Sequence, residues 1–277
     1  MLPVNATCTY TNGVRHDVFS LMALGRALSS LIFAGVLLLP NRASVAEELT
    51  LDQLIDRDVQ ALGGRAAIEA VQSIKLALHI VDPDFEVDAT YYAARPGRMR
   101  IDITAGDKRV YAEAFNGSRA WQWKGKGEPV EESKTATGAL RHGIELPGKL
   151  FGLHEVQRRG NELTLVGRES VDDIDCYVLR LTFSDGVSTT LYLDPKTWLI
   201  TRRRDVRPLH PDMDPTPTTI ETKMTDFRKV GNLVFSFAST DTDVKTGKVL
   251  EKVTVREITL NPPVPEGFFD TFETPKP

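Results

Sequence analysis

Between Glu162 and Arg204, four apolar-rich runs follow one another and are separated only by short turns. The turns read VDD, SDG and PKT, and they contain the Asp, Gly and Pro residues typical of tight reversals. A connection between parallel strands needs about a dozen residues or more, so turns this short require neighbouring strands to be antiparallel. The pattern repeats over most of the chain and carries no evident catalytic group. It therefore predicts a mainly β protein whose sheet holds something rather than reacts with it.

A period of two also dominates the regions before and after this run. From Arg98 to Thr104, Met99, Ile101 and Ile103 alternate with polar side chains, as in an antiparallel strand with one covered face. The pattern predicts strands at 73–81, 86–95, 98–104, 109–115, 119–124, 218–230, 232–242 and 248–260. We expect ten to twelve strands in all. Because strand twist accumulates, a sheet this long cannot lie flat, and we expect a single large curved antiparallel sheet.

Helices are predicted at the start of the domain and in the middle of it. Apolar residues recur at helical spacing over 51–62, with Thr50 as N-cap and Gly63-Gly64 as the stop, and a short second helix follows at 65–72. The break at 125–160 holds an apolar patch from Leu140 to Leu153, which predicts one or two short helices. These form either a mobile lid over a ligand or simply the amphipathic cover that the sheet requires. The tail at 262–269 is expected to dock back on the sheet.

The first 46 residues are predicted to be a secretory signal peptide. The 13-residue apolar run from Ala27 to Leu39 is too short to span a bilayer, and Ser44-Val45-Ala46 fits a cleavage site after Ala46. A membrane anchor is the alternative, and Met22 would make a more ordinary start. The mature domain, 47–277, is therefore expected in the periplasm.

Charge and cysteine content narrow the classes of partner. Removal of residues 1–46, with three basic residues and one acidic residue, changes the formal net charge from −4 to −6. A mildly acidic protein is a poor non-specific binder of nucleic acid, so no nucleic-acid partner is expected. Cys176 is the cysteine left after cleavage, which rules out an intramolecular disulfide, and we expect a buried structural thiol.

Motifs for catalysis and cofactors are mostly missing. The sequence has no G-x-S-x-G, no phosphate-binding G-x-x-x-x-G-K and no C-x-x-C, and His154-Glu155 lacks the second histidine of a zinc-protease motif. The best metal-like group, His210, Asp212 and Asp214, lies in a proline-rich loop without a fixed frame. His79 is interpreted as a hydrogen-bonded core histidine. We therefore expect no enzyme activity, metal or cofactor, with a hydrolase acting through His210 as a distant rival.

Several aromatic and apolar residues are candidates for lining a ligand cavity. They lie on predicted strands and in the insert: Tyr91, Trp121, Trp123, Leu150, Phe151, Tyr192, Phe235 and Phe237. The alternative is that they fill a solid core. The run Arg202-Arg203-Arg204 with Arg207 is interpreted as a solvated strand edge, with contact to anionic lipid headgroups as the alternative.

Five segments in their order and spacing resemble one known family. The segments are ALGGRAAIEAVQSIKL, FNGSRAWQW, YLDPKTWLITRR, TDFRKVGNLVFSF and VREITLNPPVPEGFF. Together they resemble outer-membrane lipoprotein-sorting-like proteins, in the superfamily of the lipoprotein carrier LolA and the receptor LolB. The resemblance covers roughly 51–269 and implies an unclosed half-barrel with helices over an apolar cavity. It also implies that a basic residue of the sheet controls the lid, for which Arg98, Arg100, Arg109 and Arg119 are candidates by location.

The functional expectation follows from this resemblance and from the strand pattern. We expect a periplasmic carrier or receptor that binds lipid, lipoprotein acyl chains or another apolar ligand, with a membrane protein as a further partner. The alternative is a sensor or regulatory subunit that binds a membrane anti-sigma factor or another protein, since the same half-barrel serves such proteins.

Overall fold

The fold is described from a computed structural model, in which residues 48–208 and 216–270 are placed. The expected leader with its cleavage after Ala46, and the group His210, Asp212 and Asp214, lie outside the described residues. All of the described residues belong to the unit Glu47–Pro277. Among them, no helix is long and apolar enough to cross a membrane.

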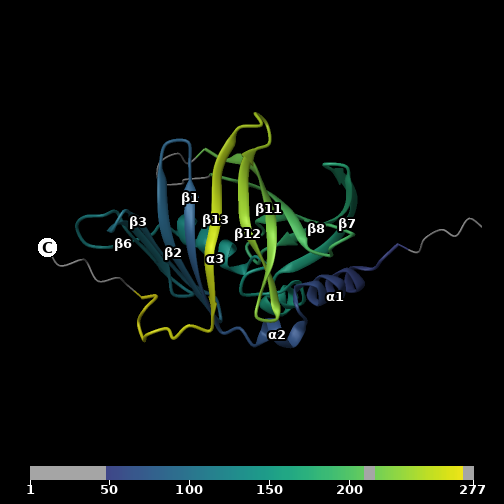
Figure 1. The fold of residues 1–277 in the computed structure, drawn as a ribbon, viewed down its shortest axis with the longest axis horizontal. Helices are drawn as coiled ribbons and strands as arrows, with labels where there is room; N and C mark the ends of the chain where they lie inside the picture. Colours follow the sequence, from purple (N-terminus) through teal and green to yellow (C-terminus); the bar gives the residue numbers. More distant parts are fainter. Residues whose placement is uncertain (1–47, 209–215, 271–277) are drawn as a thin grey trace, which may run out of the picture. The chain divides into compact units, whose positions relative to one another are not determined.

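In the described part of the chain, thirteen strands form one antiparallel sheet, in agreement with the expected mainly β, unclosed architecture (Figure 1). They are β1 (Ser73–Val81), β2 (Glu86–Ala94), β3 (Arg98–Ala105), β4 (Lys108–Phe115), β5 (Ala120–Trp123), β6 (Val130–Glu131), β7 (Glu162–Val171), β8 (Ile174–Thr182), β9 (Ser188–Leu193), β10 (Ile200–Arg207), β11 (Thr218–Val230), β12 (Leu233–Asp243) and β13 (Val249–Leu260). The number exceeds the expected ten to twelve, and the two-residue β6 is too short for its period to be visible in the sequence.

The sheet consists of two meanders joined at the middle. Its order is β6-β5-β4-β3-β2-β1-β13-β12-β11-β10-β9-β8-β7, so every neighbouring pair is consecutive in the chain except β1 and β13. The chain therefore moves outward to one edge at β6, crosses to the opposite edge at β7, and returns to close on its own first strand. The segment 132–161 makes the crossing, and we call it the insert.

The helices lie in the N-terminal segment and in the insert. They are α1 (Leu51–Leu62), α2 (Arg65–Glu69), α3 (Lys134–Glu145) and the 3-10 turns η1 (Leu153–Glu155) and η2 (Gln157–Arg159). Thr50 caps α1 as expected, since its side chain accepts from the Gln53 amide and its own amide donates to the Gln53 side chain. The second helix is shorter than expected. Figure 1 shows the strands curving around α3.

The strand registers define two faces of the sheet. Leu76, Tyr91 and Ile101 are cross-strand partners and share the face on which the helices pack, which we call the inner face. Lys75, Tyr92 and Arg100 form the neighbouring row and share the outer face. The C-terminal tail docks on the outer face as expected, with the rings of Phe268 and Tyr92 4.9 Å apart.

Two apolar clusters hold the helices on the inner face. The larger cluster joins α1, α2, α3 and the insert to β1–β4 and β12. The second joins Leu54 of α1 and Leu153 and Val156 of the insert to the inner side chains of β7–β9. Burial of one large apolar side chain contributes about 1.5–3 kcal/mol, so these contacts are the main force that seats the helices on the sheet.

Candidate functional site

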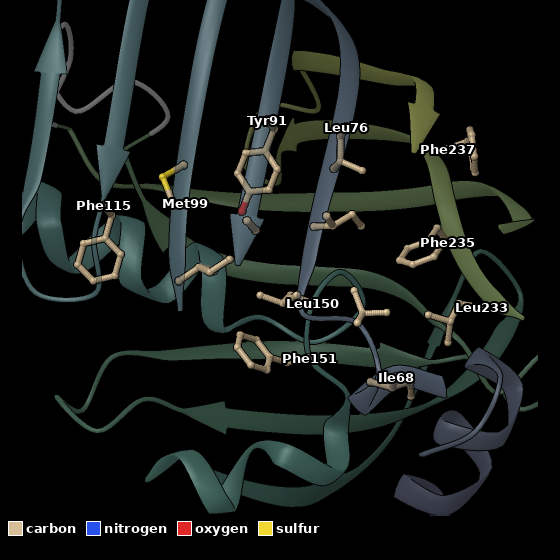
Figure 2. Packing of buried hydrophobic residues seen from close by; sticks show 14 of the residues in the cluster. Ile68, Leu76, Tyr91, Met99, Phe115, Leu150, Phe151, Leu233, Phe235 and Phe237 are labelled. Carbon is tan, nitrogen blue, oxygen red and sulfur yellow. The ribbon is translucent and has the colours of Figure 1, made fainter. Parts of the chain in front are cut away.

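The inner face carries the candidate site. Of the eight cavity residues predicted from sequence, five meet there in one cluster: Tyr91 on β2, Phe235 and Phe237 on β12, and Leu150 and Phe151 in the insert. Figure 2 shows these side chains gathered with Leu76, Met99 and Phe115 from β1, β3 and β4. Residues from distant parts of the chain thus form one apolar surface, because β1 pairs with β13 and so brings the two meanders together.

The insert fills much of this surface. Leu150 and Phe151 are 1% and 4% exposed, and they pack between the sheet and α2. The cavity bounded by Phe151, Ile68, Leu233 and neighbouring residues has a volume of about 20 Å³. A void of that size holds about one water molecule. In this conformation, the apolar surface beneath the insert is covered by the protein's own side chains.

Arg95 fixes the insert in place. Its guanidinium forms an ion pair with Glu155, with Nη1 2.7 Å from Oε1, and donates to the carbonyl oxygens of Leu150 and Val71 at 2.9 and 2.8 Å. The side chains of Arg95 and Glu155 are only 18% and 5% exposed. Burial alone would raise the pKa of Glu155, but hydrogen bonds from Arg95 and from the Gly152 amide lower it, so the carboxylate stays charged.

Arg95, the basic residue that faces the insert, was not among the arginines proposed from the sequence. The four arginines proposed by location lie on the outer face, where they stack on aromatic rings: Arg98 on Phe269, Arg100 on Phe268, Arg109 on Trp123 and Arg119 on Trp121. The available signal was position, because Arg95 ends the predicted strand at 86–95 and precedes a Pro-Gly turn.

Trp121, Trp123 and Tyr192 do not line the inner face. Register places Trp121 opposite Ala114 and Trp123 opposite Ala112, and these four residues form a separate cluster on the outer face. They share one face, as predicted from their spacing. Tyr192 lies on the outer face of β9, since it alternates with the inner residues Leu191 and Leu193. Its hydroxyl donates to Glu169 and accepts from Arg204 at 2.8 Å.

The expectation of a solvated arginine edge is wrong. Strand β10 lies inside the sheet between β9 and β11, and its arginines pair with carboxylates on both faces. On the outer face, Arg202 pairs with Asp172 and Glu221, and Arg204 pairs with Glu169 and Glu221. On the inner face, Arg203 and Arg207 both bind Asp205, at 2.7 and 2.8 Å. Paired charges of this kind neutralise an interior strand rather than protect an edge.

The remaining candidates have structural roles. Cys176 is 1% exposed in the outer-face cluster and burial raises the pKa of its thiol, as expected of a structural cysteine. His79 is hydrogen-bonded as predicted, through Nδ1 to Asp88 at 2.9 Å, although it lies on the partly exposed outer face rather than in the core. Within the described ranges, no group of three His, Cys, Asp or Glu side chains could hold a metal ion.

Comparison with known proteins identifies the architecture. No protein-family model matches this sequence, and no curated protein matches it. Among solved structures, a LolA superfamily protein from Nitrosomonas europaea is 14% identical, with a TM-score of 0.53 over 80% of this chain and 98% of that one. A DUF1329 family protein from Desulfovibrio piger is 13% identical, with a TM-score of 0.54 over 80% of this chain and 98% of that one.

A third similar structure is a domain from Vibrio parahaemolyticus that is named for outer membrane lipoprotein sorting. It is 9% identical, with a TM-score of 0.52 over 78% of this chain and 95% of that one. At these identities the likeness concerns the fold. The chain therefore has a LolA-like fold, in agreement with the resemblance seen in the sequence.

Proposed function

We propose that this chain is a non-catalytic, periplasmic carrier or receptor that binds lipid, lipoprotein acyl chains or another apolar ligand against its inner face. One observation carries the proposal. The insert joins the two free edges of an unclosed sheet and covers a continuous apolar surface without being part of that sheet. Because the insert is attached at its two ends and packs on the sheet through side chains, it can move without breaking the hydrogen bonds between paired strands.

The energetics of acyl binding suit such a surface. Each methylene transferred from water to an apolar environment contributes about 0.8 kcal/mol, so a long chain gains affinity without specific polar contacts. Leu150 and Phe151 occupy the same surface in the covered conformation. A bound acyl chain would therefore replace contacts that the insert makes with the inner face. Movement of the insert would also require free energy to break the hydrogen bonds of Arg95.

Part of the apolar surface stays accessible beside the insert. Leu78, Ile101 and Val255 belong to the inner-face cluster but are only half-buried. These side chains provide the first contact for an entering ligand, and they allow a substitution that does not disturb a fully packed core.

The primary experiment is native mass spectrometry of the mature chain, purified from the periplasm without detergent, followed by organic extraction. We expect a bound mass that extracts as phospholipid, fatty acid or acylated peptide. A bare mass that is unchanged after incubation with phospholipid vesicles would contradict the carrier proposal. That result would favour a protein-binding role, to be examined by crosslinking to membrane partners.

A matched pair of variants separates ligand binding from folding. Ile101→Gln changes the inner face, whereas Trp121→Gln changes a half-buried position on the outer face. We expect the first to lose bound lipid and the second to keep it, at similar melting temperatures. Equal lipid retention in both variants would mean that the inner face is not the binding surface.

A further inference from the structure

Lys149 places a cation within the inner face. It lies in the insert between Gly148 and the buried Leu150, and its Nζ is 5.2 Å from the centre of the Tyr91 ring. The attractive contact with the aromatic face orients the ammonium toward β2. Lys149 thus brings a positive charge from the insert to Tyr91 of the apolar cluster.

This ammonium has no ion-pair or hydrogen-bond partner among the described residues, apart from the Tyr91 ring. The arginines on the inner side of β10 differ from it. Arg207 binds Asp205 at 2.8 Å and Asp241 at 2.6 Å, and Arg203 binds Asp205 at 2.7 Å. These arginines have direct ion-pair partners within the sheet, whereas Lys149 has none among the described residues.

The surroundings of Lys149 combine protein and water. The residue is exposed to solvent, yet enclosure by the protein lowers the pKa of its ammonium, and the Arg203 cation acts in the same direction. Asp241 and Glu251 oppose that effect from β12 and β13 without forming an ion pair with Lys149. Because Lys149 is exposed, an anion in solution can reach its ammonium and form a charge-assisted contact with it.

We propose that Lys149 binds the anionic headgroup of an acyl-chain amphiphile whose chain lies along the half-buried inner-face residues Leu78, Ile101 and Val255. The inference rests on the proposed function and makes its ligand class specific. A fatty acid or an anionic phospholipid has both parts, a chain and a single negative charge beside it. The diacylglyceryl group of a lipoprotein carries no charge and would leave Lys149 without a partner.

The test compares a saturated fatty acid with the fatty alcohol of equal chain length, each measured by titration calorimetry against the mature chain. The variants are Lys149→Met, which keeps an unbranched side chain without charge, and Lys149→Arg, which keeps the charge. Lys252→Met is the control, because Lys252 is an exposed lysine on the outer side of β13. Acetate at the same concentration tests whether the carboxylate binds without a chain.

We expect the wild type to prefer the acid over the alcohol by about tenfold, the factor that corresponds to one charge-assisted hydrogen bond. Lys149→Met should abolish this preference without weakening alcohol binding, while Lys149→Arg and Lys252→Met keep it and acetate does not bind. Equal binding of acid and alcohol by the wild type would overturn the headgroup assignment and leave the carrier proposal standing. If neither amphiphile binds to the wild type, the headgroup proposal fails, and the native mass spectrometry described above decides the carrier proposal separately.

Discussion

The contacts of Arg95 join separate parts of the chain. Arg95 connects the end of β2 to α2 and the residues after it through the Ile68 and Val71 carbonyl oxygens, and to the insert through Leu150 and Glu155. When apolar residues of similar volume replace both partners of a buried ion pair, stability is often unchanged or higher. Removal of one partner alone is strongly destabilising, because the other charge stays buried and uncompensated. The stability effect of this pair therefore depends on whether one or both partners are changed.

Arg95→Met should lower the free energy of unfolding by about 3–5 kcal/mol, because Glu155 loses its ion pair with Arg95 and three carbonyl oxygens lose a donor. Urea unfolding at neutral pH measures the change. The double variant Arg95→Met with Glu155→Leu should recover part of the loss. Arg65→Met, at an exposed pair with Asp56, is the control and should cost under about 1 kcal/mol. A loss for Arg95→Met as small as that of the control would contradict this role.

Asp58 is a buried carboxyl in α1 with no hydrogen-bond partner for either oxygen among the described residues. Burial raises its pKa well above the usual range. The folded state therefore binds a proton more tightly than the unfolded state does. The wild type is stabilised by that proton at low pH, and the stabilisation is lost as the pH rises toward the folded-state pKa.

Asp58→Asn should consequently stabilise the protein by an amount that depends on pH. The gain should be smallest below about pH 3, where the carboxyl is protonated in both states, and should increase above that by up to about 1.4 kcal/mol per pH unit until the folded-state pKa is passed. Urea unfolding at a series of pH values measures it. Asp56→Asn, on the exposed side of the same helix, is the control. If the stability gained by Asp58→Asn did not change with pH, Asp58 would ionise in the folded state as easily as in the unfolded state.

Among the elements, the corner between α1 and α2 depends on a close backbone approach. Gly63 has φ +123°, and a Cβ at this position would lie 2.1 Å from the carbonyl oxygen of Asn232 in the β11–β12 turn. Gly64 also has a positive φ, +96°, but a Cβ there would meet nothing within 4 Å. Comparison of alanine substitutions at the two glycines therefore distinguishes the effect of backbone strain from that of steric contact.

Gly63→Ala should destabilise the protein by clearly more than Gly64→Ala. The second substitution costs only the strain of a positive φ, about 1 kcal/mol or somewhat more, whereas the first also displaces the β11–β12 turn. Thermal unfolding of both variants measures the difference. Equal melting temperatures would mean that the corner adjusts freely and does not seat α1 on the sheet.

At the scale of the whole molecule, the insert and the sheet should respond differently to a ligand. A fatty acid whose headgroup is held by Lys149 and whose chain displaces Leu150 and Phe151 should speed amide hydrogen exchange in 150–156, while the centre of the sheet at β1 and β13 stays protected. Hydrogen-exchange mass spectrometry with and without the fatty acid measures this, and acetate is the control. Slower exchange throughout the insert would indicate that the ligand binds over the cover and does not displace it.

The sequence allowed most of the strands and the first helix to be predicted. Their signals are local, because a period of two, a short turn or a capping residue depends on neighbours a few positions away. Prediction was less accurate where a local signal was weak. The two-residue β6 shows no period, and α2 ends earlier than its apolar residues indicated.

The candidate site was predicted only in part, because face and register are not local properties. Tyr192 could have been assigned to the outer face, since it alternates with Leu191 and Leu193. The face of Trp121 and Trp123 could not be assigned from the sequence. The register between β3 and β4 shifts between Ile103 and Thr104, before the chain reaches β5. An irregularity of one residue reverses the face of every side chain that follows.

By itself, the sequence determined that this chain forms a large antiparallel sheet with an apolar face and helices to cover it. Only the tertiary structure decided that β1 pairs with β13, that Arg95 ties down the insert and that Lys149 contacts the Tyr91 ring of the inner face. The physical reason is distance along the chain. Local patterns reflect the conformational preferences of adjacent residues, whereas these contacts arise when two meanders separated by the insert are brought together by burial of their shared apolar face.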